Sequence, residues 1–209
     1  MNSTWLKIRI LLILVLTSAI LSPTITAEAN DTDVANIEYQ IKVAFLYNFL
    51  KFVEFSEEKS VDPNEPVIIS IIGEDVFNDT INYLENKTIK GRKIIVNKYK
   101  GIEELQNNDQ TKTSKLHPET DAIRKTHLLF ICPSEKKHVK EILKLIKGYG
   151  VLTVADNKGF LEAGGIINFL TENERVRFEV NLVAAKQAEI NIRSKLLRLA
   201  KRIYKPKDK

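Results

Sequence analysis

Val67-Ile68-Ile69-Ser70-Ile71-Ile72, closed by Gly73, is the stretch of sequence that decides the fold. Its β-branched residues favour an extended strand. An almost unbroken apolar run, without polar and apolar alternation, is typical of a strand buried on both faces. Such strands occur in parallel sheets that carry helices on either side. The stretch therefore predicts the central strand of an α/β sheet.

Further strand-like segments follow at spacings that leave room for helices between them. Helices are expected from Glu74-Asp75 through Leu84 and over residues 135–147. The last two strands are joined by Thr171-Glu172-Asn173-Glu174, whose length suits a hairpin. The pattern predicts an α/β domain with a mostly parallel sheet of five to six strands, an antiparallel edge hairpin and helices on both faces. The remaining strands are expected at residues 92–97, 127–132, 151–155, 166–170 and 176–180.

The first helix is expected over residues 34–55 and has two apolar faces. A single domain core needs only one of them. The second face either lies under another part of the domain or meets a partner surface, and both interpretations stay open. One face carries Tyr39, Val43, Leu46, Phe49, Leu50 and Val53, and the other carries Ile37, Ile41, Ala44, Phe45, Phe52 and Phe55.

Two other segments have weaker patterns. Residues 105–125 are polar and without period, which predicts a flexible surface loop. The chain is expected to end in two short helices. The first covers residues 182–188, and the second is capped by Ser194 and runs to Tyr204.

The N-terminus has the pattern of a secretory signal. Lys7 and Arg9 precede a short apolar run, and the small-residue site Ala27-Glu28-Ala29 follows it. We expect residues 1–29 to be a signal peptide, cleaved after Ala27 or Ala29, and residues 30–209 to form one exported domain without stable membrane insertion. An uncleaved N-terminal anchor is the alternative.

The formal charge of +5 comes from the end of the chain. Residues 193–209 carry eight basic side chains and one acidic one, whereas residues 30–192 are mildly acidic. Export and this distribution argue against a nucleic-acid-binding protein. The basic terminus is either a solvated helix and tail or a patch for a partner or an anionic membrane. The single cysteine, Cys132, ends an apolar strand and is expected to be buried and inert, with a redox or intermolecular-disulfide role as the alternative.

Catalytic motifs are missing from the sequence. There is no GxxxxGK[ST] loop, no HExxH pair and no GxSxG elbow. His117, His127 and His138 lack the spacing of metal ligands. We therefore expect no enzyme activity, no cofactor and no metal site.

Two polar groups are nevertheless candidates for binding. Gly73, Glu74 and Asp75 follow the central strand, and Asp156 follows a later one, where open α/β sheets bind ligands. Asp75 is also well placed to cap the next helix. The second group is Arg175, Arg177 and Glu179, which share one strand face and form either a solvated ion-pair ladder or a partner contact.

Several ordered blocks of this sequence resemble the YfiR-like family of exported bacterial proteins. The first is Glu38-Tyr39-Gln40-Ile41-Lys42-Val43-Ala44-Phe45-Leu46-Tyr47-Asn48-Phe49-Leu50-Lys51-Phe52-Val53-Glu54. The others are Ile72-Gly73-Glu74-Asp75-Val76-Phe77, Val151-Leu152-Thr153-Val154-Ala155-Asp156 with Gly159-Phe160, Gly165-Ile166-Ile167-Asn168-Phe169 through Val176-Arg177-Phe178-Glu179-Val180-Asn181, and Ser194-Lys195-Leu196-Leu197-Arg198-Leu199-Ala200.

The resemblance implies a periplasmic regulator that binds the periplasmic domain of an inner-membrane diguanylate cyclase and represses it, lowering cyclic di-GMP and biofilm growth. It also implies a homodimer. We place the contacts for the cyclase among Tyr47, Phe49 and Phe52, with Asn48 and Lys51 as polar contacts and the group around Arg177 as a second candidate surface. The alternative is a periplasmic small-ligand sensor that feeds another membrane receptor and binds at Gly73, Glu74, Asp75 and Asp156.

The sequence departs from the family in two respects. Phe55-Ser56 stands where familiar members have Trp-Pro after the first block. Those members also carry cysteines that form redox-linked disulfides, whereas this chain has only Cys132. Intramolecular disulfide switching therefore does not apply here.

Overall fold

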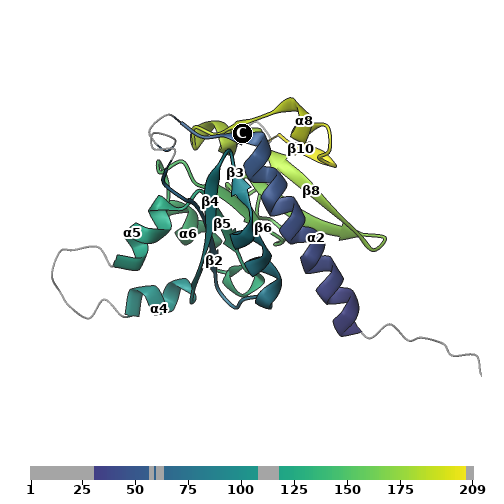
Figure 1. Ribbon diagram of the computed structural model, residues 1–209, viewed down its shortest axis with the longest axis horizontal. Helices are drawn as coiled ribbons and strands as arrows, with labels where there is room; N and C mark the ends of the chain where they lie inside the picture. The colour runs from purple at the N-terminus through teal and green to yellow at the C-terminus, as the bar shows by residue number, and fades with distance from the viewer. Residues whose placement is uncertain (1–30, 57–58, 60–63, 108–117, 206–209) are drawn as a thin grey trace, which may run out of the picture. The chain divides into compact units, whose positions relative to one another are not determined.

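The computed structural model describes residues 31–56, 59, 64–107 and 118–205 (Figure 1). Residues 34–209 form one compact unit. A separate N-terminal unit ends at Asp33, and only its residues 31–33 are described. The expected signal peptide, its cleavage sites and most of the polar run in the expected loop lie outside the described residues.

The described strands form one eight-stranded sheet and a separate two-stranded pair. The large sheet has the order β10-β8-β7-β6-β5-β2-β4-β3, and all pairings between its central strands, from β4 to β7, are parallel. Strand β8 is antiparallel to β7, β3 is antiparallel to β4, and β10 is parallel to β8. The strands are β2 (Val67–Ile72), β3 (Thr88–Ile89), β4 (Arg92–Tyr99), β5 (Leu128–Ile131), β6 (Leu152–Ala155), β7 (Ile167–Glu172), β8 (Arg175–Asn181) and β10 (Arg202–Tyr204), with β1 (Val53–Glu54) and β9 (Asn191–Ile192) in the pair.

Helices cover both faces of the large sheet, as Figure 1 shows. The helix α2 (Asp31–Phe52) and the 3-10 helix η1 (Asn78–Asn86) contribute to the core on one face. The helices α4 (Ile102–Asn107), α5 (Pro118–Lys125) and α6 (Val139–Leu145) contribute to the core on the other. The remaining short elements are η2 (Pro133–Glu135), α7 (Leu182–Gln187) and α8 (Ser194–Leu197).

The predicted fold class is confirmed. All six predicted strands are present, and the last two form the antiparallel hairpin. The structure adds the short strands β3 and β10, which raises the sheet from six strands to eight. Strands of two or three residues carry no hydrophobic period, so only their pairing with a longer neighbour defines them.

Some local predictions were wrong. The expected loop at residues 105–125 is helical at both ends, because Leu105 and Ile123 on α4 and α5 are buried in the second core. The expected helix from Ser194 to Tyr204 ends at Leu197, and Ser194 does not cap it, since the capping position belongs to Arg193. Residues 202–204 instead extend the sheet by pairing with β8, and this pairing overrides their helical spacing.

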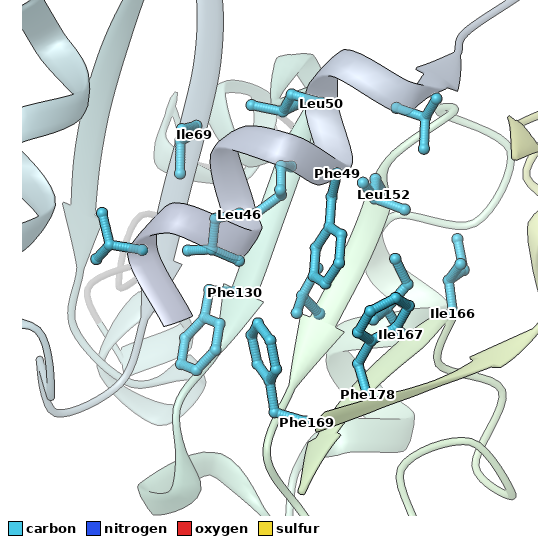
Figure 2. Packing of buried hydrophobic residues seen from close by; sticks show 14 of the residues in the cluster. Leu46, Phe49, Leu50, Ile69, Phe130, Leu152, Ile166, Ile167, Phe169 and Phe178 are labelled. Atoms are coloured by element: carbon cyan, nitrogen blue, oxygen red, sulfur yellow. The ribbon is translucent and has the colours of Figure 1, made fainter. Parts of the chain in front are cut away.

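The inner face of α2 forms the centre of the larger core. Phe49 is fully buried between two sheet residues, with ring centroids 5.5 Å from Phe169 and 5.0 Å from Phe178. Leu46 and Leu50 are buried beside it, as Figure 2 shows. Aromatic pairs at these distances stabilise a core beyond the area they bury.

The outer face of α2 divides into two halves. Phe52 is half-buried, and the amide of Arg193 donates to its carbonyl, so the C-terminal segment covers this half. The predicted helix to residue 55 was wrong at its end, because the chain pairs as β1 from Val53, and Phe55 lies beyond the helix. Towards the N-terminus, Ile37 is 56% exposed and Ile41 is 40% exposed. One half of the second apolar face is therefore covered within the domain and the other half is open.

Replacing Phe49 by alanine should lower the free energy of unfolding by about 3–5 kcal/mol, because the removed ring leaves a cavity in the core. Ile37→Ala is the matched control on the same helix and should change stability by less than about 0.5 kcal/mol. Urea unfolding of both variants measures the difference. Equal losses would contradict the assignment of inner and outer faces.

Candidate functional site

The carboxyl ends of the central strands bring several charged and polar residues to one edge of the sheet. Asp75 follows β2, Cys132 follows β5, and Asp156 follows β6. Parallel strands place these ends side by side, which is where open α/β sheets bind ligands. The charges of Asp75 and Asp156 both act on Cys132, which shows that the three lie near one another.

A buried ion pair joins α2 to this edge. Lys42 is 2% exposed, and its Nζ lies 2.7 Å from Asp156 Oδ2 and 2.6 Å from Glu38 Oε1. The Tyr39 hydroxyl donates to the same Asp156 oxygen at 3.4 Å. Lys42 could not be identified from the sequence, because the pattern does not show whether a lysine between two apolar helix faces is buried or exposed.

The other carboxylate oxygen of Asp156, Oδ1, does not take part in the ion pair with Lys42. Asp156 Oδ1 is buried and has no hydrogen-bond partner among the described residues.

Burial, reinforced by the nearby charge of Asp156, raises the pKa of Tyr39 above its usual range. Burial also raises the pKa of Cys132 to about 12, so its thiol is protonated at neutral pH. The predicted burial of Cys132 is confirmed, and the thiol is unpaired.

The residues predicted to bind a ligand have protein partners already. Asp75 accepts a hydrogen bond from the Phe77 amide at 2.9 Å and pairs with Lys98 Nζ at 2.7 Å. The Glu74 amide donates to Ser134 Oγ at 2.9 Å. Gly73 has a φ of +103°, and a Cβ there would lie 2.5 Å from Ser134 Oγ. These contacts give Gly73 and Asp75 structural roles in the turn after β2.

The predicted contacts on α2 lie in very different environments. Phe49 is fully buried, so the prediction that it contacts a partner was wrong. Its spacing along the helix puts it on the face that packs against the sheet. Phe52 is half-buried beneath Lys195, whose Nζ lies 5.4 Å from the ring centroid. Asn48 donates to the carbonyl of Ala44 in its own helix at 3.0 Å.

Tyr47 and Lys51 lie on a surface that continues onto η1. The half-buried Tyr47 donates from its hydroxyl to the Thr88 carbonyl at 3.2 Å, and Lys51 Nζ lies 5.3 Å from the Tyr47 ring centroid. Tyr83 is 60% exposed, and Lys87 Nζ lies 4.4 Å from its ring centroid. A hydrogen bond to Tyr83, with a smaller contribution from Tyr47, raises the pKa of Lys87. We call Tyr47, Lys51, Tyr83 and Lys87 the Tyr-Lys surface.

The second candidate surface lies elsewhere. Val176 and Phe178 pack into the core with α2, so the alternate residues Arg175, Arg177 and Glu179 point to the opposite face of β8. Glu179 pairs with Arg202 of β10 through two bonds, Nε–Oε1 at 2.7 Å and Nη2–Oε2 at 2.9 Å. The ion pair therefore crosses to the neighbouring strand, which argues against the first interpretation, a ladder within β8, and leaves a partner contact as a prediction.

His127 lies at the opposite edge of the sheet, just before β5. Its Nδ1 is 3.1 Å from the Ile68 amide nitrogen, and its Nε2 is 3.1 Å from Arg92 Nη2. Burial, together with the charges of Arg92 and Lys59, lowers the pKa of His127 to about 4. A protonated ring would face a permanent cation, so the imidazole is neutral at pH 7. The described residues contain no cluster of three or more His, Cys, Asp or Glu that could hold a metal ion.

These observations define a three-layer α/β domain in which the charged groups at the carboxyl edge of the sheet mainly join its layers. The chain belongs to the YfiR/HmsC-like family, whose pattern it matches over residues 39–201. The match begins at Tyr39 within α2 and runs past α8, so it includes every strand of the large sheet except β10. The predicted family is confirmed.

Two solved structures share the fold. A conserved domain protein from Vibrio cholerae O1 biovar El Tor superposes with a TM-score of 0.54 at 10% identity, covering 79% of this chain and 60% of that one. An ABC domain from Streptococcus pneumoniae in complex with L-Trp superposes with a TM-score of 0.51 at 9% identity, covering 80% and 60%. The chain thus spans about 60% of the length of each protein, and the similarity concerns the fold alone. No curated protein matches the sequence.

The match to the YfiR/HmsC-like family supports, in general terms, a periplasmic regulator of cyclic di-GMP signalling. None of the helices in the described part of the chain is long and apolar enough to cross a membrane.

The ion pair of Lys42 and Asp156 should show strong coupling in a double-mutant cycle. Lys42→Met leaves a buried carboxylate without its cation and should cost about 3–5 kcal/mol of stability. The double variant Lys42→Met, Asp156→Leu removes both charges and should be more stable than the single variant. Urea unfolding of the four proteins measures the coupling, and additive losses would show that the pair is not buried as described.

Stability should fall in acid because of His127. Its pKa of about 4 in the folded state lies below the value of about 6.5 in the unfolded chain. The unfolded state therefore binds more protons between these values, and stability is lost as the pH falls from 6.5 to 4, by up to about 3 kcal/mol. His127→Gln should lose less stability over this range. Chemical unfolding at several pH values tests this, and identical pH profiles would contradict it.

Proposed function

We propose that this protein represses an inner-membrane diguanylate cyclase by binding its periplasmic domain. The family supports a regulator of cyclic di-GMP signalling. The N-terminal sequence favours export, which would bring the domain to the periplasmic side of such a cyclase. The absence of a recognisable catalytic motif favours action through binding.

The Tyr-Lys surface is the observation that carries this proposal. Tyrosine is enriched among the residues that dominate binding energy at protein interfaces. Tyr47 is held in place by its bond to the Thr88 carbonyl, so binding costs it little conformational freedom. Lys51 and Lys87 add positive charge beside two rings, which suits an acidic patch on the cyclase.

Repression then depends on a difference in affinity. Binding outside the membrane can shift the cyclase only as far as the regulator prefers the inactive arrangement over the active one. A hundredfold shift requires about 2.7 kcal/mol of differential binding. Two aromatic contacts with accompanying charges are sufficient for an effect of this size.

Cellular cyclic di-GMP tests the proposal directly. Deletion of the gene should raise it, and the full-length protein should restore the original level, whereas a version without residues 1–29 should not. The variant Tyr47→Ala, Lys87→Glu should fail to repress although it is exported and folded, because it removes one aromatic contact and reverses one charge. Mass spectrometry of cell extracts measures the nucleotide.

Lys125→Glu is the matched control, because Lys125 is exposed on α5 and belongs to the opposite layer. It should repress like the wild type. If deletion leaves cyclic di-GMP unchanged, repression of a cyclase is the wrong function. If deletion raises it but the Tyr47→Ala, Lys87→Glu variant represses fully, the function stands and the Tyr-Lys surface is the wrong site.

A further inference from the structure

A cleft of about 600 Å³ opens between α6 and α7, away from the Tyr-Lys surface. It arises because β6 and β7 pair only at Val154 with Ile167 and at Ala155 with Asn168. One step earlier, the Ile166 amide donates to the side chain of Thr153 at 3.0 Å instead of to a backbone carbonyl. The two strands diverge from this point, and the helices form the walls of the gap.

The floor of the cleft is apolar. Leu143 and Ile146 line it from the side of α6, Val151 and Ile166 from the sheet, and Ala184 from α7. The volume lies within the range of about 300–1,000 Å³ that is typical of small-molecule sites. A floor of this kind favours a ligand with an apolar body.

The rim of the cleft is positively charged. Lys140 and Lys144 lie on the side of α6 that borders the cleft, Lys147 lies in the turn that follows this helix, and all three are exposed. No Asp or Glu among the described residues lines the cleft, and no ion pair joins these lysines to a described carboxylate. The rim therefore favours an anionic group and disfavours a cationic one.

We propose that this cleft binds an amphipathic monocarboxylate, with the carboxylate at the three lysines and the apolar body on the floor. The site goes beyond the proposed repression of a cyclase, because it uses residues of α6, α7 and the β6–β7 gap that lie outside the Tyr-Lys surface. Free fatty acids and aryl carboxylates share this chemistry. They differ in the apolar body, which is a flexible alkyl chain in a fatty acid and contains a rigid ring in an aryl carboxylate.

Titration calorimetry of the purified exported protein with decanoate tests the site. Decanoate should bind, whereas decanol and decyltrimethylammonium, which have the same chain and a neutral or cationic head, should bind at least tenfold more weakly. Each added CH₂ between octanoate and decanoate should tighten binding by about fourfold, because it buries more apolar surface. Phenylacetate serves as the aryl arm, and its tighter binding would identify an aryl carboxylate as the better occupant.

Two charge-matched variants distinguish the cleft from general attraction to a basic protein. Lys140→Gln, Lys144→Gln, Lys147→Gln should weaken decanoate binding at least tenfold. Lys93→Gln, Lys125→Gln, Lys158→Gln removes the same charge from exposed positions outside the cleft and should leave the affinity unchanged. No binding of any carboxylate, equal losses in both variants, or an affinity independent of chain length would each overturn the proposal.

Discussion

The contact of Phe49 with Phe169 and Phe178 is the interaction on which the rest of the structure depends. It joins the first long helix to the hairpin of β7 and β8, and so connects the first block of the family resemblance to a later one. Because the ring is fully buried, the sheet and the helix can approach only in one register. Because this contact turns the inner face of α2 towards the sheet, the outer face, with its open and covered halves, points away from the sheet.

The ion pair of Lys42 and Asp156 acts on the same helix by a different force. Burying two charges is costly, and the pair offsets this cost only when both partners are correctly placed. The aromatic contact therefore contributes apolar burial, and the ion pair penalises any helix position that separates the charges. Asp156, which was predicted to bind a ligand, therefore has a partner within the domain.

The sequence was informative where one segment carried its own pattern. The strand at residues 67–72 is almost entirely apolar, so its central position could be predicted without knowledge of its neighbours. The two faces of α2 were also predictable, and the face that holds Phe49 is the one that is buried. The prediction that Phe49 contacts a partner conflicted with the helical spacing that places it on the core face. The structure agrees with the spacing.

Features made by distant segments could not be predicted in this way. Tyr83 and Lys87 join Tyr47 only because the chain from η1 into β3 folds back to α2, where the Thr88 carbonyl accepts from the Tyr47 hydroxyl. The three residues of β10 become a strand only next to β8. The cleft between α6 and α7 is likewise a gap between strands, which no local sequence pattern encodes. Each of these features depends on tertiary pairing rather than on local propensity.

The distance along the chain between Phe49 and its partners also has a kinetic consequence. The helix forms from local contacts, but the part of its inner face around Phe49 stays uncovered until the hairpin of β7 and β8 has been synthesised and has folded. Until then the apolar side chains of this part of the helix are exposed to other chains, a condition that favours aggregation. Delayed folding bound to a chaperone therefore suits this topology, and the slow step should be the docking of the hairpin rather than the formation of the helix.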